Sequence, residues 1–396
     1  MRIALISSSF APYIGGVEEH TRQVADHLLA EGHEVEVWTV DRGEHLGELR
    51  MGGVPIRYLP TPLPARRLPS LVHFATSQPR AWRAWTRAWR EFRPQVLHVQ
   101  CFGPNGLYAL ALHARRRTPL VLSSHGETFT DDHGVFDQSR LLNSGLRRAG
   151  RAAAAVTGCS SLVVRDLAAH FGIAEAIVVP NGVDLGPDRG GEAHRPAAWP
   201  AGPTILAVGR LERVKGFDLL LRAFAAMPRP GGANLIIAGT GSQLEDLRCL
   251  ADHLGVADRV VFAGRMTPEE VASAMSAATV VAVPSRMEAF GIVVLEAWRS
   301  GRPLVATSRG GPGTLVTDDV DGLLVDPDDC GAFAAALHRV VADERLARRL
   351  GAAGRRTVEK YTWDAAVDKY VAIYGEAVSR RATPRRGRVP RRSAPR

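Results

Sequence analysis

The feature that most constrains the fold is an alternation of short apolar runs with longer segments of helical periodicity, found in both halves of the chain. The runs consist almost entirely of Val, Ile, Leu and Ala, which is typical of parallel strands covered on both faces. Segment 17–31 places Val17, Val24 and Leu28 on one helical stripe. The predicted strands are 2–6, 34–40, 95–100, 119–124, 153–157, 176–179, 204–208, 233–238, 259–262, 279–283, 303–306 and 322–325. This alternation predicts two doubly wound α/β units.

A segment rich in Gly and Pro separates the two halves. Residues 186–202, GPDRGGEAHRPAAWPAG, have no apolar period, which favours a linker. We therefore expect one Rossmann-like domain over 1–185 and a second over 203–362, facing each other across a cleft. A final helix, 363–379, is expected to cross back to the first domain. Ligands of such sheets bind beyond the carboxyl ends of the strands, so both domains should offer loops to the cleft.

The basic charge is concentrated at the end of the chain. The formal net charge is +9, and residues 380–396 contain eight arginines and no acid, which leaves the rest of the chain nearly neutral. A nearly neutral body disfavours a nucleic-acid enzyme. The Pro- and Arg-rich tail is predicted to be disordered and solvated, with an anchor to anionic lipid as the alternative.

The sequence also bears on location. No apolar stretch approaches the length of a membrane span, and no signal peptide is recognisable at the start. The four cysteines lie far apart and form no C-x-x-C pair, which argues against a zinc site or a disulfide framework. We therefore predict a cytoplasmic protein, with the inner face of the membrane as an alternative position.

Two glutamates eight residues apart mark a candidate ligand site. They lie in SRMEAFGIVVLEAWRSG, residues 285–301, between predicted strand 279–283 and a helix expected over 291–300. Glu288 then belongs to the strand-to-helix loop and Glu296 to the second helical turn. The helix start presents free backbone N–H groups, a natural anion site. A partly buried Glu296 requires hydrogen-bond donors, and a ribose diol would supply two. The alternative is an ordinary surface glutamate.

Two cations form a second cluster. ILAVGRLERVKGFDLLL, residues 205–221, places Arg210 and Lys215 in a loop between a strand and a helix. Such a pair would neutralise a diphosphate, whereas either cation alone could be a solvated loop charge. Glycines at further strand exits are weaker signals, since many α/β turns contain them. They are Gly15 and Gly16 after the first strand, and Gly239 and Gly241 after strand 233–238; His125 also follows a strand.

These motifs together resemble the family 4 retaining glycosyltransferases. The resemblance rests on Gly209-Arg210-Leu211 followed by Lys215, on Glu288-x7-Glu296 with Phe290-Gly291, on PNGVD at 180–184, and on the N-terminal Gly-Gly. It extends in order to about residue 379. The resemblance implies the GT-B architecture of two Rossmann-like domains. It also implies transfer of a sugar from a nucleotide diphosphate sugar to a hydroxyl acceptor, with the anomeric configuration kept.

The resemblance also implies roles for single residues. Arg210 and Lys215 would bind the diphosphate and stabilise the leaving nucleotide, Glu288 would contact the donor sugar, and Glu296 would hold the ribose. His125 would lie beside the sugar at the reacting centre. The implied catalytic residues are His125, Arg210, Lys215 and Glu288. The implied donor-binding residues are Gly15, Gly16, Gly209, Arg210, Lys215, Arg265, Met266, Glu288, Ala289, Phe290, Gly291, Ile292 and Glu296.

The resemblance also implies that no metal or other cofactor is needed. Fixed cations can account for this, because they stabilise the charge that develops on a leaving diphosphate. Asp326-Pro327-Asp328 has the spacing of a metal-binding D-x-D motif, but we interpret it as turn chemistry. Thr314 stands where the family commonly has an acidic residue. PNGVD is interpreted as an Asn-Gly turn before the linker.

An aromatic stripe bears on the acceptor. Trp82, Trp85, Trp89 and Phe92 share one helical face, beside a stripe of arginines at 80, 83, 87, 90 and 93. We favour a core helix that packs its aromatic residues on the first sheet; the alternative is an interfacial helix resting on anionic lipid. The partners expected are a nucleotide-sugar donor and a carbohydrate, lipid-linked or small-molecule acceptor chosen by first-domain loops, including 41–80.

Other functions remain open at this stage. A nucleotide-sugar 2-epimerase shares the architecture, and a non-catalytic nucleotide-sugar-binding protein is a third candidate. A nicotinamide dehydrogenase is disfavoured because no G-x-G-x-x-G follows the first strand. The donor is expected to be a UDP- or GDP-sugar, and the product a glycan, glycolipid or exopolysaccharide.

Overall fold

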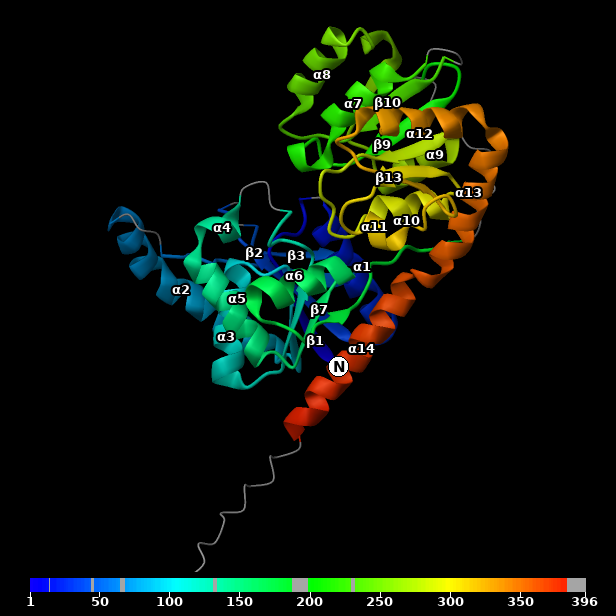
Figure 1. Cartoon of the computed structure of the whole chain (residues 1–396). Helices are drawn as coiled ribbons and strands as arrows, with labels where there is room; N and C mark the ends of the chain where they lie inside the picture. The colour runs from blue at the N-terminus through cyan, green and yellow to red at the C-terminus, as the bar shows by residue number, and fades with distance from the viewer. Residues whose placement is uncertain are drawn as a thin grey trace, which may run out of the picture.

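The computed structural model describes residues 1–13, 15–43, 46–64, 68–130, 134–186, 199–228 and 232–382. Within them the chain forms two lobes, each built on one sheet with helices on its faces (Figure 1). Most of the predicted linker and all but the start of the predicted basic tail, residues 187–198 and 383–396, lie outside the described residues. None of the described helices has the length and apolar content that a membrane crossing requires.

The first sheet has the order β3-β4-β2-β1-β5-β6-β7-β8. Its strand pairs are parallel except β3 with β4, which are antiparallel. The strands are β1 (Arg2–Ser7), β2 (Glu34–Val40), β3 (Glu48–Met51), β4 (Val54–Leu59), β5 (Val96–Gln100), β6 (Leu120–Ser124), β7 (Ala155–Gly158) and β8 (Ile177–Val178). The helices of this lobe are α1 (Gly16–Ala30), α2 (Leu68–Phe92), α3 (Pro104–Arg116), α4 (Val135–Gln138), α5 (Arg140–Ala152) and α6 (Ser161–Phe171).

The second sheet has the order β11-β10-β9-β12-β13-β14 and its pairs are all parallel. Its strands are β9 (Thr204–Val208), β10 (Asn234–Ala238), β11 (Val260–Gly264), β12 (Val280–Val283), β13 (Leu304–Thr307) and β14 (Leu323–Val325). Its helices are α7 (Phe217–Ala226), α8 (Leu244–His253), α9 (Pro268–Ala277), α10 (Ile292–Arg299), α11 (Pro312–Leu315), α12 (Cys330–Ala342) and α13 (Glu344–Thr357). Short 3₁₀ turns lie at Arg213–Lys215, Ala257–Arg259 and Val358–Lys360.

The prediction of a doubly wound α/β fold is confirmed, and each predicted strand is present to within about two residues. The hairpin β3–β4 was missed, and the expectation of loops over 41–80 is wrong for this hairpin and for α2. β3 is exposed along its whole length, and β4 alternates buried and partly exposed residues. Neither strand therefore has the continuous apolar run by which the others were recognised.

Both sheets reverse their strand order at one point, which positions the site. Strands are added on one side of β1 up to β4 and then on the other side from β5, and the second sheet does the same between β9 and β12. Loops that leave the carboxyl ends of strands at such a switch point diverge, and ligands of doubly wound sheets bind in the crevice between them.

The last helix, α14 (Trp363–Ala382), returns to the first lobe and runs along it, as Figure 1 shows in red. Its residues Trp363, Val367, Tyr370 and Tyr374 are almost completely buried in one core cluster with Ile3, Leu5 and Val24. Truncating a side chain buried to this extent typically costs about 2–5 kcal/mol. α14 is therefore an integral part of the first lobe's core.

The aromatic stripe of α2 faces the core, as the core-helix interpretation predicts. Trp85 is fully buried and stacks on Tyr108 at 5.3 Å between ring centroids. Trp82 and Trp89 are partly buried, and guanidinium groups from α3 lie over them: Arg115 over Trp82 at 4.7 Å and Arg116 over Trp89 at 4.8 Å. The interfacial interpretation, in which these rings rest on lipid, is wrong for Trp85.

Candidate active site

A lysine and a glutamate from separate loops form an ion pair at the switch point of the second sheet. Lys215 ends the short 3₁₀ turn after β9, and Glu288 lies in the loop between β12 and α10. Lys215 Nζ lies 2.6 Å from Glu288 Oε2, and Ser285 Oγ donates to the same oxygen at 3.3 Å. Their side chains are 24% and 16% exposed, so both remain reachable from solvent. The structure thus brings together one cation and one acid of the predicted site.

The start of α10 lies beside this pair. Gly291 precedes the helix with a φ of 98°, in the left-handed region that favours glycine. No side chain caps the helix start, and its first turn contains no acidic residue. The first backbone N–H groups of α10 therefore lack side-chain acceptors and carry the positive end of the helix dipole. The Gly311 N–H donates to the Glu288 carbonyl at 2.7 Å and fixes the loop that leads to this start.

Glu296 lies one turn further along α10 and is partly buried. Burial raises the pKa of its carboxyl above the usual value; Glu19, in α1 of the first lobe, raises it further and Arg299 lowers it. Within the described residues, its carboxylate takes part in no hydrogen bond or ion pair with another side chain. Glu296 is thus an acceptor available to a hydroxyl-bearing ligand.

The other donor-side residues lie on loops of the same lobe. Arg210 follows Gly209 after β9 and is exposed, and the described residues include no carboxylate paired with it. Arg265 and Met266 follow β11. Arg265 is exposed, whereas Met266 is partly buried against the core. The structure therefore places Arg210 and Arg265 at the exits of β9 and β11, with β10 between them, and leaves their side chains open to solvent.

The first lobe contributes glycines and a histidine opposite these loops. Gly15 and Gly16 lie at the start of α1, and a Cβ on Gly16 would lie 3.8 Å from Ile292 Cδ1 of α10. His125 follows β6, and its Nε2 lies 2.9 Å from Gln100 Oε1. An amide oxygen only accepts, so the hydrogen of His125 is on Nε2. Burial lowers the pKa of His125 well below its usual value, so the ring is neutral at neutral pH.

The two lobes touch at Ala289, the residue after Glu288. Ser160 Oγ of the first lobe donates to the Ala289 carbonyl oxygen at 2.6 Å. Gly126, beside His125, has a φ of 91°, and a Cβ built on it would lie 2.5 Å from Ala289 Cβ. That distance is a clash, so only glycine permits this approach. The loop of Glu288 is therefore held against the loop of His125.

A buried polar chain, which sequence reasoning missed, connects His125 with α14. Gln100 joins His125 to His98, which contacts Tyr374 OH at 2.5 Å through Nδ1 and Ser123 Oγ at 2.7 Å through Nε2. Its signal was available in the sequence, because His98 and Gln100 are polar residues within an otherwise apolar strand. Burial, with a smaller contribution from His20, lowers the pKa of His98 to about 3.

His20 of α1 belongs to the same cluster. Its ring contacts that of His125 edge-on, with 4.4 Å between centroids. Its Nδ1 lies 2.8 Å from Asn181 Oδ1, and its Nε2 lies 3.3 Å from Tyr370 OH. Both nitrogens are satisfied in the neutral form, and burial lowers its pKa to about 4.

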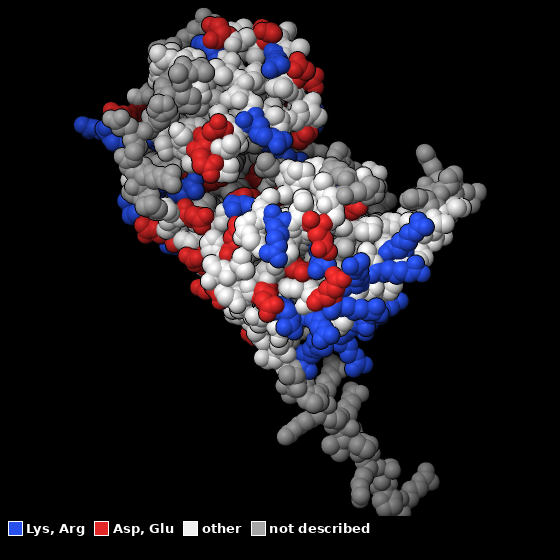
Figure 2. Space-filling view, turned by 180° about the vertical axis from the view of Figure 1, so that it is seen from behind, with Lys and Arg blue, Asp and Glu red and all other residues white. Residues whose placement is uncertain are grey.

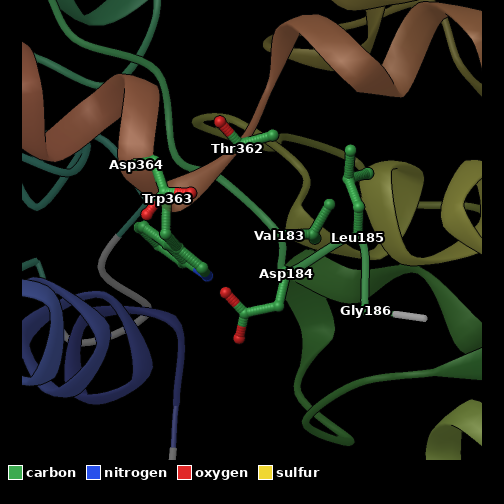
Figure 3. Close-up of a pocket in the computed structure, with 7 residues that line it drawn as sticks. All are labelled: Val183, Asp184, Leu185, Gly186, Thr362, Trp363 and Asp364. Carbon is green, nitrogen blue, oxygen red and sulfur yellow. The ribbon is translucent and has the colours of Figure 1, made fainter.

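The interpretation of PNGVD, residues 180–184, as an Asn-Gly turn is wrong. The segment does not turn; it crosses between the lobes, where Val183 forms a parallel bridge with Thr362. A cavity of about 260 Å³ lies at this crossover, lined by residues 183–186 and 362–364. Figure 3 shows the side chains of Asp184 and Trp363 pointing toward one another there. This cavity belongs to the crossover and is separate from the Lys215–Glu288 pair.

The remaining motifs have local partners. Arg309 forms ion pairs with both acids of Asp326-Pro327-Asp328. Its Nη2 lies 2.7 Å from Asp326 Oδ1, and its Nη1 lies 2.8 Å from Asp328 Oδ2. Thr314 Oγ1 donates to the Gly311 carbonyl at 2.8 Å. Among the described residues there is no group of three or more His, Cys, Asp and Glu side chains placed to hold a metal ion.

Two doubly wound sheets, one in each lobe, are the arrangement of the GT-B fold. Solved structures share this fold. Sucrose-phosphate synthase from Thermosynechococcus elongatus superposes with a TM-score of 0.80 at 25% identity, covering 96% of this chain and 99% of that one. Anabaena HepE in complex with UDP superposes with a TM-score of 0.76 at 19% identity, covering 95% and 100%.

The sequence comparisons define the family. Residues 14–186 match Glycosyltransferase Family 4, and residues 193–357 match Glycosyl transferases group 1. The D-inositol 3-phosphate glycosyltransferase of Acidothermus cellulolyticus is 31% identical over 96% of this chain and 92% of its own length. The GDP-mannose-dependent alpha-mannosyltransferase of Mycolicibacterium smegmatis is 30% identical over 96% and 99%. The chain belongs to the family 4, group 1 glycosyltransferases.

Proposed function

We propose that this glycosyltransferase moves a sugar from a UDP- or GDP-sugar to a hydroxyl acceptor with retention of the anomeric configuration. The observation that carries the proposal is the Lys215–Glu288 pair beside the uncapped start of α10. A cation, a helix start and an acid within one small region match the three parts of a sugar diphosphate: charge, phosphate oxygens and hydroxyls.

The proposed roles follow from the chemistry of each group. Lys215 and Arg210 neutralise the diphosphate, and the N–H groups at the start of α10 bind its oxygens. Glu288 accepts hydrogen bonds from the donor sugar's hydroxyls. When the donor enters, Lys215 exchanges its carboxylate partner for phosphate, which releases Glu288 for the sugar. Glu296 accepts from the ribose, and Arg265 and Met266 flank the base.

The reaction forms one bond and breaks one bond at the anomeric carbon. The acceptor oxygen forms a bond to the anomeric carbon while the bond between that carbon and the diphosphate oxygen breaks. Both electrons of the broken bond stay on the diphosphate. The acceptor's proton passes to a phosphate oxygen on the same face, so the configuration is retained. Lys215 and Arg210 stabilise the charge that develops on the leaving group, which makes a metal ion unnecessary.

Ligand binding and transfer test the proposal separately. Thermal unfolding is measured with UDP, GDP and ADP; the correct nucleotide at 100 times its Kd adds about 2.7 kcal/mol of stability. Transfer from the matching sugar is then followed by NMR of the anomeric proton, with and without EDTA. Inversion, or loss of transfer with EDTA, contradicts the proposal. Interconversion of the donor without any acceptor supports a 2-epimerase instead, and binding without either reaction supports a non-catalytic binding protein.

We also propose that the first lobe contacts the anionic inner face of a membrane through a basic surface. Arg83, Arg90, Arg93 and Arg117 are exposed on and beside α2 and α3. Figure 2 shows the blue side chains gathered on this part of the molecule. Each such cation near an anionic bilayer contributes about 1 kcal/mol.

Vesicle sedimentation tests this contact. We expect co-sedimentation with vesicles containing phosphatidylserine but not with phosphatidylcholine alone, and a loss of binding in the Arg83→Glu, Arg90→Glu double variant. Arg248→Glu, an exposed substitution in the second lobe, serves as the matched control. Equal partition of all three proteins excludes the membrane contact.

A further inference from the structure

A cavity of about 430 Å³ lies in the first lobe beside His125. It is lined from five directions: the end of β1 with α1, β2 and the segment after it, the loop after β5 with the start of α3, the loop after β6, and α4 with α5. Most of the wall is apolar, although the cavity adjoins the proposed reacting centre. The apolar residues are Val17, Val40, Phe102, Pro104, Val135, Phe136 and Leu142.

The wall contains one cation with no acidic partner among the described residues. Arg42 is exposed, and its guanidinium lies over the Tyr13 ring at 4.4 Å. The aromatic ring holds the guanidinium in place without neutralising its charge. Arg42 therefore provides a fixed positive group at the solvent side of an apolar cavity.

The acid in the same wall is already engaged. Glu127 accepts hydrogen bonds from the backbone N–H groups of Phe102 and His125, each at 2.8 Å, and from Ser124 Oγ at 2.9 Å. Its carboxylate holds the loop of His125 in place, and burial raises its pKa. Besides its apolar residues, the wall therefore has a positive group at Arg42, the neutral ring of His125, and the smaller polar side chains of Ser8, Cys101 and Thr130. Thr130 Oγ1 already donates to the Gly126 carbonyl.

We infer that the acceptor is a small anionic amphiphile, in which an apolar group joins the reacting hydroxyl to a phosphate or carboxylate. The inference rests on the proposed glycosyltransfer and names the acceptor class of that site. The apolar group fills the cavity, the anion pairs with Arg42, and the hydroxyl lies near His125. That hydroxyl oxygen bonds to the anomeric carbon, and its proton leaves on the departing diphosphate.

The same wall disfavours a bare polyol phosphate. A polyol in this cavity would turn several hydroxyls toward Val, Leu and Phe side chains, and each unpaired hydroxyl costs free energy. The Acidothermus cellulolyticus relative is named for inositol 3-phosphate. We therefore expect this chain to differ from that relative in its acceptor, although the two share the donor-side loops.

A series of ω-hydroxyalkyl phosphates tests the inference by calorimetry on the full chain. Probes with four, six and eight methylenes are compared with inositol 3-phosphate and with 1,8-octanediol. Each buried methylene should raise affinity about fourfold. The diol, which lacks the anion, and the Arg42→Gln variant should each bind about tenfold more weakly. Arg248→Gln, an exposed substitution in the second lobe away from the cavity, is the control and should match wild type.

A second variant tests the wall itself. Val135 lines the cavity and is 42% exposed, so Val135→Asp should leave the fold intact while placing a carboxylate beside the apolar chain. We expect it to abolish the dependence on chain length, and Val135→Leu to keep it. Affinity independent of chain length, or tighter binding of inositol 3-phosphate than of the eight-carbon probe, overturns the inference. Because nucleotide binding is measured separately, such a failure leaves the proposed glycosyltransfer standing.

Discussion

Lys215 Nζ and Glu288 Oε2 lie 2.6 Å apart although 73 residues separate them in the chain. The contact joins the loop after β9 to the loop after β12, the two strands at which the second sheet reverses its order. In this structure each charge thus compensates the other. A bound diphosphate and sugar would provide each side chain with a new partner.

Lys215→Ala and Glu288→Ala should each abolish measurable transfer while the protein stays folded. For Lys215, loss of a group that stabilises the leaving charge costs about 3–4 kcal/mol of barrier, or about 10²–10³ in rate. For Glu288, the loss comes from the hydrogen bonds that orient the donor sugar for reaction. Steady-state kinetics and thermal melts provide the measurement. Glu245→Ala, which breaks an exposed helical pair with Arg248, is the matched control and should keep full activity. Turnover at the wild-type rate by either variant would contradict the assignment.

Glu296→Gln should raise KM for the donor about tenfold or more, with a smaller effect on kcat, because it weakens contact with the ribose. The pH dependence should change too. Burial raises the pKa of Glu296, so lowering the pH protonates this carboxyl earlier than an ordinary glutamate and weakens donor binding. In the Gln variant this acidic loss of affinity should vanish. A pH profile unchanged by the substitution rules out the proposed role.

Gly126→Ala should reduce transfer strongly by separating the lobes. The added Cβ would lie 2.5 Å from Ala289 Cβ, and the positive φ adds strain. Ser160→Ala, which removes only the hydrogen bond to the Ala289 carbonyl, should have a smaller effect of the same kind. Small-angle scattering should show a larger radius of gyration for Gly126→Ala. An active, compact Gly126→Ala protein would show that this contact does not matter for the reaction.

The protein should lose stability on mild acidification. The folded pKa values of His20 and His98 are depressed to about 4 and about 3, so below an unfolded pKa of about 6.5 only the unfolded state takes up these protons. Each histidine then lowers the free energy of unfolding by about 1.4 kcal/mol per pH unit as the pH falls from 6.5 toward 4. Urea unfolding at pH 7.5 and pH 5.5 measures the difference.

His98→Gln should reduce this acid sensitivity, whereas His253→Gln, at an exposed position on α8, should not. Equal unfolding free energies at both pH values would mean that these rings become protonated in the folded state.

Tyr370→Phe removes the hydroxyl that faces His20 Nε2 and should lower the free energy of unfolding by about 1–3 kcal/mol at pH 7.5.

The sequence predicted the fold through strands that contain few residues other than Val, Ile, Leu and Ala. β3 was missed because it is the edge strand and is exposed along its whole length. β4 was missed because its buried residues are interrupted by partly exposed ones, so it has no continuous apolar run. Among the site residues, the loop positions of Lys215 and Glu288 followed from strand ends and helix starts. Their direct contact did not, because the distance between two loops depends on the packing of β9 against β12.

The buried cluster was hidden for a similar reason. His20, His98 and Tyr374 come from a helix, a strand and the last helix, and nothing local in the sequence connects them. A polar residue in an apolar strand signals that a partner exists, but it does not identify the partner. The same applies to Asn181, whose partner His20 lies 161 residues away.

Because α14 returns to the first lobe, that lobe is not complete without the last helix. A fragment that stops at the interlobe segment would lack Trp363, Tyr370 and Tyr374, and would expose an apolar trough that those side chains normally fill. To produce the first lobe alone, residues 363–382 must therefore be supplied with it, either fused to the fragment or added as a peptide.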